Sequence, residues 1–198
     1  MSLSYLIRCD TPVATIGDYL DGLGHDHRLH EVRSLAMKDQ ERLWRLAAAS
    51  PPLTLDHFVP PRVPDLREVI HHGKNSLPVF TTFQKRFCRP PGDAERLFGY
   101  NEGITRPVVG PGFFVVHPTA GNPAWEERGA VVVDYWLTPE GSVDPRWPRI
   151  VGNAQGLQRF VYYHTRDFMR GVSAHVSIGK AWKVEKPLPA FFLLCRED

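Results

Sequence analysis

The chain has 198 residues, a net charge of +2, 42% apolar residues and 23% charged residues. This composition is typical of a folded globular protein and excludes a chain that is disordered along its whole length. The small net charge argues against a nucleic-acid partner or an anionic membrane surface. No apolar stretch reaches the roughly 20 residues that cross a bilayer. We therefore predict one domain over residues 1–198, with neither nucleic acid nor membrane as a partner.

The three cysteines, Cys9, Cys88 and Cys195, are odd in number and widely separated. No pair of them has the spacing of a metal site, and the first ten residues lack the basic and apolar segments of a signal peptide. We therefore expect a cytoplasmic protein with reduced thiols. Cys88 lies among basic residues that favour a thiolate, but no catalytic Cys–His signature accompanies it, so we expect an inert thiol. No sequence motif identifies a cofactor.

The N-terminal portion, residues 11–49, has the pattern of helices. A short helix is expected over residues 14–23, followed by a longer one over residues 29–49. Pro51 provides a stop for the second helix.

Histidines and carboxylates are crowded near the start of this longer helix, at His25, His27, His30 and Glu31. Imidazole and carboxylate groups both bind divalent metals, but only His27 and Glu31 are four residues apart on one helix face. The alternative is a polar helix start with acidic groups in its first turn. We favour the polar helix start and predict no metal site.

Residues 53–137 differ in pattern from the helical N-terminal portion, because proline and glycine interrupt short runs of strand-forming residues. The connections between these runs are too short for the crossovers of a parallel sheet, so an antiparallel sheet is expected. The predicted strands cover residues 65–71, 80–89, 97–100, 113–117 and 130–137.

Residues 156–182 place apolar side chains at spacings of three and four, the repeat of one helix face. A last strand is expected over residues 189–195. The predicted fold class is α+β: N-terminal helices, then a mostly antiparallel, curved sheet packed on one long C-terminal helix, with a final strand after the helix. The long helix and last strand form the portion 153–198.

The segment 80–89 is informative at a period of two, since Phe83, Lys85, Phe87 and Arg89 share one face. The phenylalanines should point inward and take the two cations with them. An inward cation needs a protein carboxylate or an anionic ligand as its partner. We predict a ligand site here, with a structural ion pair or a cation reaching out to solvent as the alternative.

Asp134 occupies the middle of an apolar strand, which is costly unless the carboxylate is paired or protonated. It is expected either to balance Lys85 or to act as a general acid or base. His117, on a neighbouring strand, shares its face with apolar residues and is a further candidate for recognising a charged ligand.

On the predicted long helix, His164 and Asp167 are three residues apart and close enough to meet on one turn. Such a pair can orient an imidazole for proton transfer. A buried histidine bonded to the backbone is the alternative. The polar segment 71–78 precedes the Lys85 strand and is expected to be a loop that closes over the same site, contributing His71 or His72 and Asn75.

These patterns favour an intracellular domain that binds a small, anionic, partly apolar molecule in a cavity between sheet and helix. The first alternative is a small-molecule enzyme that uses His164, Asp167 or Asp134 in acid–base chemistry in that cavity. The second is a protein-interaction module or homodimer, which exposed tryptophans at positions 44, 125 or 147 would favour.

Overall fold

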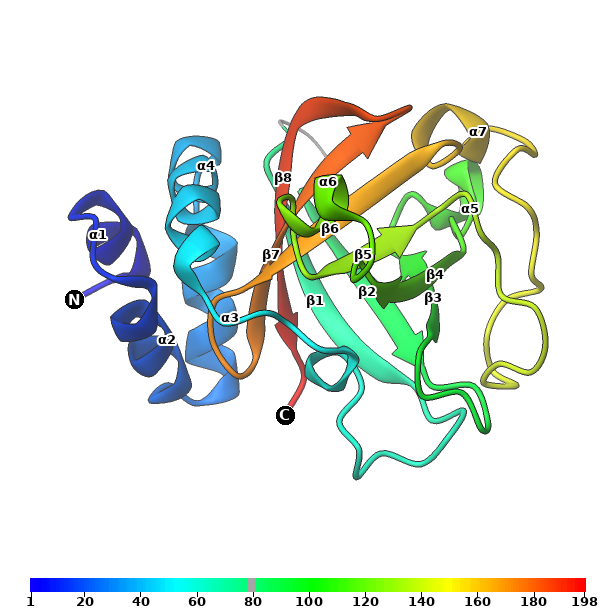
Figure 1. The fold of residues 1–198 in the computed structure, drawn as a ribbon, viewed down its shortest axis with the longest axis horizontal. Coiled ribbons are helices and arrows are strands. Elements are labelled where there is room, and N and C mark those ends of the chain that lie inside the picture. Colours follow the sequence, from blue (N-terminus) through cyan, green and yellow to red (C-terminus); the bar gives the residue numbers. More distant parts are fainter. Residues whose placement is uncertain (78–80) are drawn as a thin grey trace.

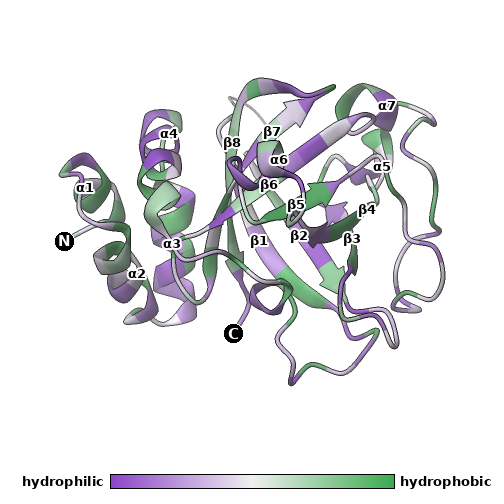
Figure 2. Cartoon of the chain, viewed as in Figure 1, coloured by the Kyte–Doolittle hydropathy of each residue, from purple (hydrophilic) through white to green (hydrophobic). Residues whose placement is uncertain are grey.

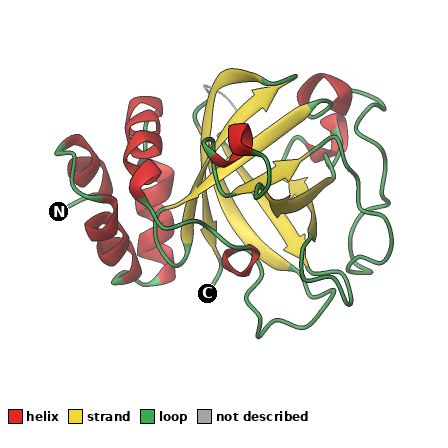
Figure 3. Cartoon of the chain, in the orientation of Figure 1, coloured by secondary structure: helices red, strands yellow, loops and turns green. Residues whose placement is uncertain are grey.

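The computed structural model describes residues 1–77 and 81–198. Within this part of the chain, eight strands form a closed barrel: each strand pairs antiparallel with the next, and β8 pairs with β1 (Figures 1 and 3). A sheet closed in this way has no free edge. The strands are β1 (Val69–Asn75), β2 (Thr82–Cys88), β3 (Leu97–Glu102), β4 (Phe114–Pro118), β5 (Val131–Asp134), β6 (Thr165–Gly171), β7 (Val176–Lys183) and β8 (Lys186–Arg196).

The predicted antiparallel sheet is confirmed, but the predicted long C-terminal helix is wrong. Residues 156–182 contain only the single turn α7 (Gln158–Val161), followed by β6 and β7. The fold is therefore a barrel with helices on its outside, rather than a sheet packed on one helix. The proposed cavity between sheet and helix does not exist in that form.

Burial on both faces explains why this segment has the spacing of a helix. Met169 in β6 points into the barrel core, while its neighbour Phe168 packs outside with the N-terminal helices. A strand that is buried on both faces loses the alternation between apolar and polar residues. Its apolar positions then match a helical repeat as well as a strand repeat.

The N-terminal helices are shorter than predicted and more numerous. The expected helix over residues 29–49 is divided, because Leu35 and Ala36 have extended backbone between two helices. A further helix occupies the first residues of the chain, where no helix was predicted. The helices are α1 (Leu3–Arg8), α2 (Val13–Asp21), α3 (His25–Ser34) and α4 (Met37–Leu46), followed by the 3-10 turns η1 (Ala47–Ala49) and η2 (Leu55–His57).

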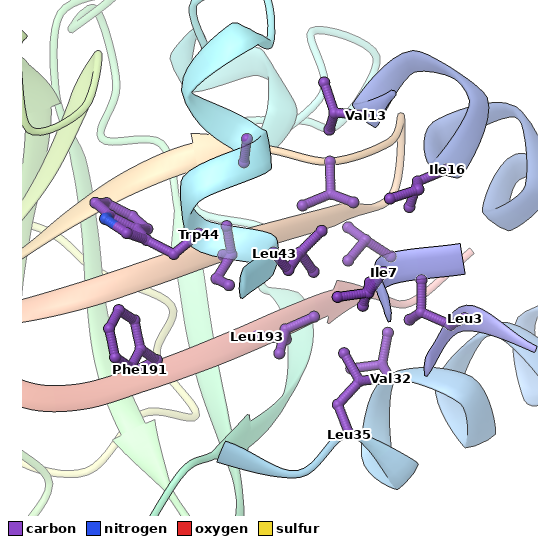
Figure 4. Close-up of a cluster of buried hydrophobic side chains, with 14 of the residues drawn as sticks. Leu3, Ile7, Val13, Ile16, Val32, Leu35, Leu43, Trp44, Phe191 and Leu193 are labelled. Carbon is purple, nitrogen blue, oxygen red and sulfur yellow. The ribbon is translucent and has the colours of Figure 1, made fainter. Parts of the chain in front are cut away.

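These helices cover the outer face of β7 and β8, at the left of Figure 1. Figure 4 shows Phe191 and Leu193 of β8 pointing toward Leu43, Trp44 and Ile7 of the helices. Alternate residues of β8 therefore belong to different cores: Phe191 and Leu193 pack with the helices, and Phe192 and Leu194 pack inside the barrel.

Large aromatic rings fill the barrel interior, and glycines at the paired positions of adjacent strands make room for them. A Cβ atom at Gly99 would lie 2.2 Å from the Phe114 ring, and one at Gly179 would lie 2.2 Å from the Phe192 ring. Both distances are far below van der Waals contact. Glycine at these positions allows the rings to lie flat against the backbone of the neighbouring strand.

The strand positions agree broadly with the alternation in the sequence, with one difference at the first strand. Residues 71–78 were expected to form a loop, but His71 to Asn75 belong to β1. The predicted strand 80–89 begins at Phe80, which lies outside the described residues, as does Pro78 of the predicted loop. Two further single-turn helices are α5 (Arg106–Val109) and α6 (Pro123–Glu126). None of the helices in the described ranges combines the length and the apolar content needed to span a bilayer.

Candidate functional site

A cavity of about 380 Å³ opens at the end of the barrel where α5 and α7 lie. Most of its lining is apolar, and Figure 2 colours much of α5 and part of α7 as hydrophobic. Apolar side chains at the entrance are well exposed, including Ile104 (81%), Leu77 and Val161. The ion pair between Arg106 and Glu102 lies in the same wall, with 2.7 Å between Nε and Oε1.

Four polar side chains, three of them from different strands and one from the residue that follows β5, meet where the cavity reaches the barrel core. Lys85 of β2 is 2% exposed, and its Nζ donates to Asn101 Oδ1 at 3.0 Å and to the Tyr135 hydroxyl. Asp167 Oδ2 of β6 lies 3.2 Å from the same Nζ. Three acceptors therefore satisfy the three protons of the ammonium group.

The remaining contacts hold this cluster in place. Asn101 Nδ2 donates to the backbone oxygen of Gly112 at 2.9 Å, which fixes the amide so that its oxygen faces Lys85. The Tyr162 ring stacks on Tyr135 with 5.2 Å between centroids. These contacts join β3, the segment between α5 and β4, and the residues that directly follow β5 and α7, so the same segments form the end of the barrel and hold the polar cluster.

Burial dominates the protonation of the cluster. It lowers the pKa of Lys85 and raises the pKa of Asp167, and the mutual attraction of the two charges only partly opposes these shifts. Burial also raises the pKa of Tyr135 well above its ordinary value and that of Tyr162 to about 12. Both phenols therefore keep their protons at neutral pH and remain hydrogen-bond donors.

Four of the residues that the sequence singled out line this cavity: Lys85, Phe83, Asn75 and Asp167. The alternation in β2 correctly predicts that Lys85 points inward. Phe87 points inward as well, but it packs deeper in the core against Phe114 and does not line the cavity.

Other predicted residues lie outside the barrel or beyond its far end. Arg89 follows β2 and pairs with Asp56 at 2.9 Å. Asp134 does not balance Lys85: it faces outward and accepts from Arg166 Nε at 2.8 Å, with His117 Nε2 at 3.8 Å. Burial alone would raise the pKa of Asp134, but these two side chains outweigh it and hold the pKa below its usual value.

The histidine positions also differ from the expected arrangement. His164 and Asp167 do not pair on a helix, because the helix is absent; His164 is stacked at the surface between Trp136 and Tyr163. His71 is buried at the opposite end of the barrel, where its Nε2 lies 3.0 Å from the Phe58 backbone oxygen. His72 points out toward α3, near Glu197.

Asn101, Tyr135 and Tyr162 belong to the site, and sequence reasoning did not select them. For Tyr135 a signal was present, since it shares a strand face with Val131 and Val133, which places its hydroxyl in an apolar interior. Asn101 gives no such signal, because a polar residue at the end of a strand is ordinarily solvated.

The described residues give no support for a reactive cysteine at position 88 or for a metal site. Burial raises the pKa of the Cys88 thiol to about 12, so this cysteine stays protonated. No group of three His, Cys, Asp or Glu side chains in the described ranges is arranged to hold a metal ion.

Comparison of the chain with known protein families, with curated proteins and with solved structures finds no match. The geometry of the barrel cavity is therefore the basis for assigning a function.

Proposed function

We propose that the protein binds a small, mostly apolar molecule inside the barrel, with one polar end of the ligand at Lys85, Asn101 and Tyr135. The observation that carries this proposal is the cavity itself: an apolar space of about 380 Å³ that ends at a buried polar cluster. Ligand pockets commonly combine an apolar lining with a few polar groups that orient the ligand.

The charge of the cluster narrows the class of ligand. Lys85 is paired with Asp167 across 3.2 Å, so the pair has no net charge for an anion to neutralise. A carboxylate entering beside Asp167 would meet repulsion in a medium of low dielectric constant. We therefore propose an uncharged polar end, such as a carbonyl or a hydroxyl group, in place of the anionic group expected from the sequence.

The two other functions suggested by the sequence have less support from the geometry. Of the expected acid–base residues His164, Asp167 and Asp134, only Asp167 lines the cavity. Trp44 and Trp147 are each 7% exposed, and Trp125 is partly buried against the core that the N-terminal helices share with the barrel, which weakens one sequence-based reason for an interaction surface.

The test is titration with N-phenyl-1-naphthylamine, an uncharged fluorophore that brightens in apolar surroundings. The blocking variant is Ala181→Leu, because Ala181 lines the cavity from β7 and a larger side chain extends into its empty volume. The matched control is Ala174→Leu, at an exposed position in the turn between β6 and β7.

We expect saturable binding with one site per chain. Ala181→Leu should weaken it by about tenfold or more, equivalent to about 1.4 kcal/mol, and Ala174→Leu should leave it unchanged. Equal binding by both variants would place the fluorophore outside the barrel and refute the proposal. A native mass spectrum of the purified protein then shows whether an organic molecule accompanies the chain.

A further inference from the structure

Lys85 is the only amine among the described residues that line the cavity. Its Nζ lies 4.9–5.7 Å from the centroids of four aromatic rings, those of Phe83, Phe114, Tyr135 and Phe192. The side chain is 3% exposed. An amine in this position meets a molecule inside the barrel but has almost no contact with bulk water.

We infer that Lys85 forms an imine with an apolar aldehyde that enters the cavity. This inference rests on the proposed function, because the aldehyde must first bind inside the barrel. It goes further by naming the reactive group of the ligand and the atom to which the ligand becomes attached.

The directions in which burial shifts the pKa values of Lys85 and Asp167 help this reaction. An amine attacks a carbonyl only in its unprotonated form, and desolvation in an apolar pocket is one way in which lysines are activated. Burial lowers the pKa of Lys85 and raises that of Asp167. Both shifts bring the two pKa values closer together, which lowers the cost of moving one proton from the ammonium group to the carboxylate, 3.2 Å away, when the aldehyde reacts.

The reaction needs no further reagent. The Nζ lone pair forms a bond to the aldehyde carbon, and the carbonyl oxygen takes the proton held by Asp167 to give a carbinolamine. A proton from Nζ returns through Asp167 to the hydroxyl group, which leaves as water while the C=N bond forms. The balance is one aldehyde and one amine giving one imine and one water, with no change in oxidation state.

The polar groups around Lys85 keep hydrogen-bond partners after the imine has formed. An ammonium group needs three acceptors, whereas a protonated imine needs one, which Asp167 supplies as the counter-ion. The acceptors that are released, Asn101 Oδ1 and the Tyr135 hydroxyl, lie 3.3 Å apart, and the hydroxyl donates to the amide oxygen in the present structure. Imine formation therefore leaves no buried polar group of this cluster without a partner.

The test uses octanal as the probe and sodium cyanoborohydride to convert any imine into a stable secondary amine. Mass spectrometry of the intact chain counts the octyl groups, and peptide mapping locates them. We expect Lys85 to be modified at least about tenfold faster than any other lysine, because the others lack a desolvated site beside a carboxyl group. Lys85→Met should lose this modification.

The Ala181→Leu variant provides a second comparison that does not depend on the folding of Lys85→Met. It should slow modification of Lys85 and leave the surface lysines unaffected. Octan-1-ol, which has the same chain but no carbonyl, separates binding from reaction. If octan-1-ol and octanal both displace N-phenyl-1-naphthylamine and Lys85 stays unmodified, the imine is refuted and the proposed function stands. If neither displaces a fluorophore whose binding Ala181→Leu weakens, the imine is refuted and the proposed function stands. If the fluorophore itself does not bind inside the barrel, both proposals fail.

Discussion

Replacing Asp167 by asparagine should destabilise the protein strongly, because it removes the negative charge that faces Lys85 inside the barrel. Lys85 Nζ lies 3.2 Å from Asp167 Oδ2, and the two side chains are 3% and 7% exposed. Two unit charges at this distance attract each other by about 5 kcal/mol at an effective dielectric constant of about 20. Removing one partner of a buried pair typically costs about 3–5 kcal/mol, since the other charge stays buried without compensation.

The assay is urea denaturation of the parent and of Asp167→Asn at neutral pH, with a loss of about 3–5 kcal/mol expected. In thermal unfolding, about 2–4 °C per kcal/mol for a chain of this length gives a fall of about 6–20 °C. The Lys85→Met single variant and the double variant complete a thermodynamic cycle. In the double variant Tyr135 and Asn101 still bond to each other, so we expect it to recover much of the loss.

Two results would refute this reasoning. One is a loss below about 1 kcal/mol for Asp167→Asn, the value of an exposed ion pair. The other is a double variant whose loss equals the sum of the two single losses, because independent sites behave additively.

Two further predictions concern His57, in the turn η2, and Gly99, in β3. Burial lowers the pKa of His57 from 6.5 to about 3, so between these pH values the unfolded chain binds a proton that the folded chain does not. Stability should therefore fall with decreasing pH below about 6.5, and His57→Leu should remove about 1.4 kcal/mol per pH unit from that slope in urea denaturation series; an unchanged slope would contradict the assignment. Gly99→Ala places a Cβ atom 2.2 Å from a Phe114 ring carbon and 2.6 Å from a backbone oxygen, which should cost about 1–3 kcal/mol of unfolding free energy. The control Gly152→Ala, whose Cβ atom would have its nearest neighbour 3.9 Å away, should change stability by less than about 0.5 kcal/mol, and equal effects at both glycines would argue against a filled barrel interior.

The orientation of Lys85 was predictable from the sequence, because β2 has phenylalanines on both sides of it at a period of two. Its partner was not predictable. Asp167 and Asp134 both lie in segments with apolar residues on either side, and sequence patterns do not state which face of a strand will be inside a closed barrel. Only the pairing of β5 with β6 shows that these two carboxylates point to opposite sides of the sheet.

The wrong prediction of a long helix over residues 156–182 has a related cause. A helix and a strand can be told apart by their apolar pattern only when one face is polar. Here the N-terminal helices cover the outer face of β7 and β8, so both faces of these strands are apolar. Predicting that cover requires knowing which distant segments meet, and this information is not present in a local window. The same limit applies to Asn101, whose role depends on its approach to Tyr135 from another strand.

Closure of the barrel also sets the order in which the chain can complete its structure during synthesis. The last strand, β8, pairs with the first, β1, and it also supplies Phe191 and Leu193 to the core of helices α1 to α4. Helices α1 to α4 are synthesised first, but their apolar faces stay uncovered until β8 has been synthesised. Such long-range pairing slows folding and prolongs the exposure of apolar surface. A nascent chain of this protein that lacks β8 is accordingly expected to leave the apolar faces of α1 to α4 exposed to solvent or to chaperones.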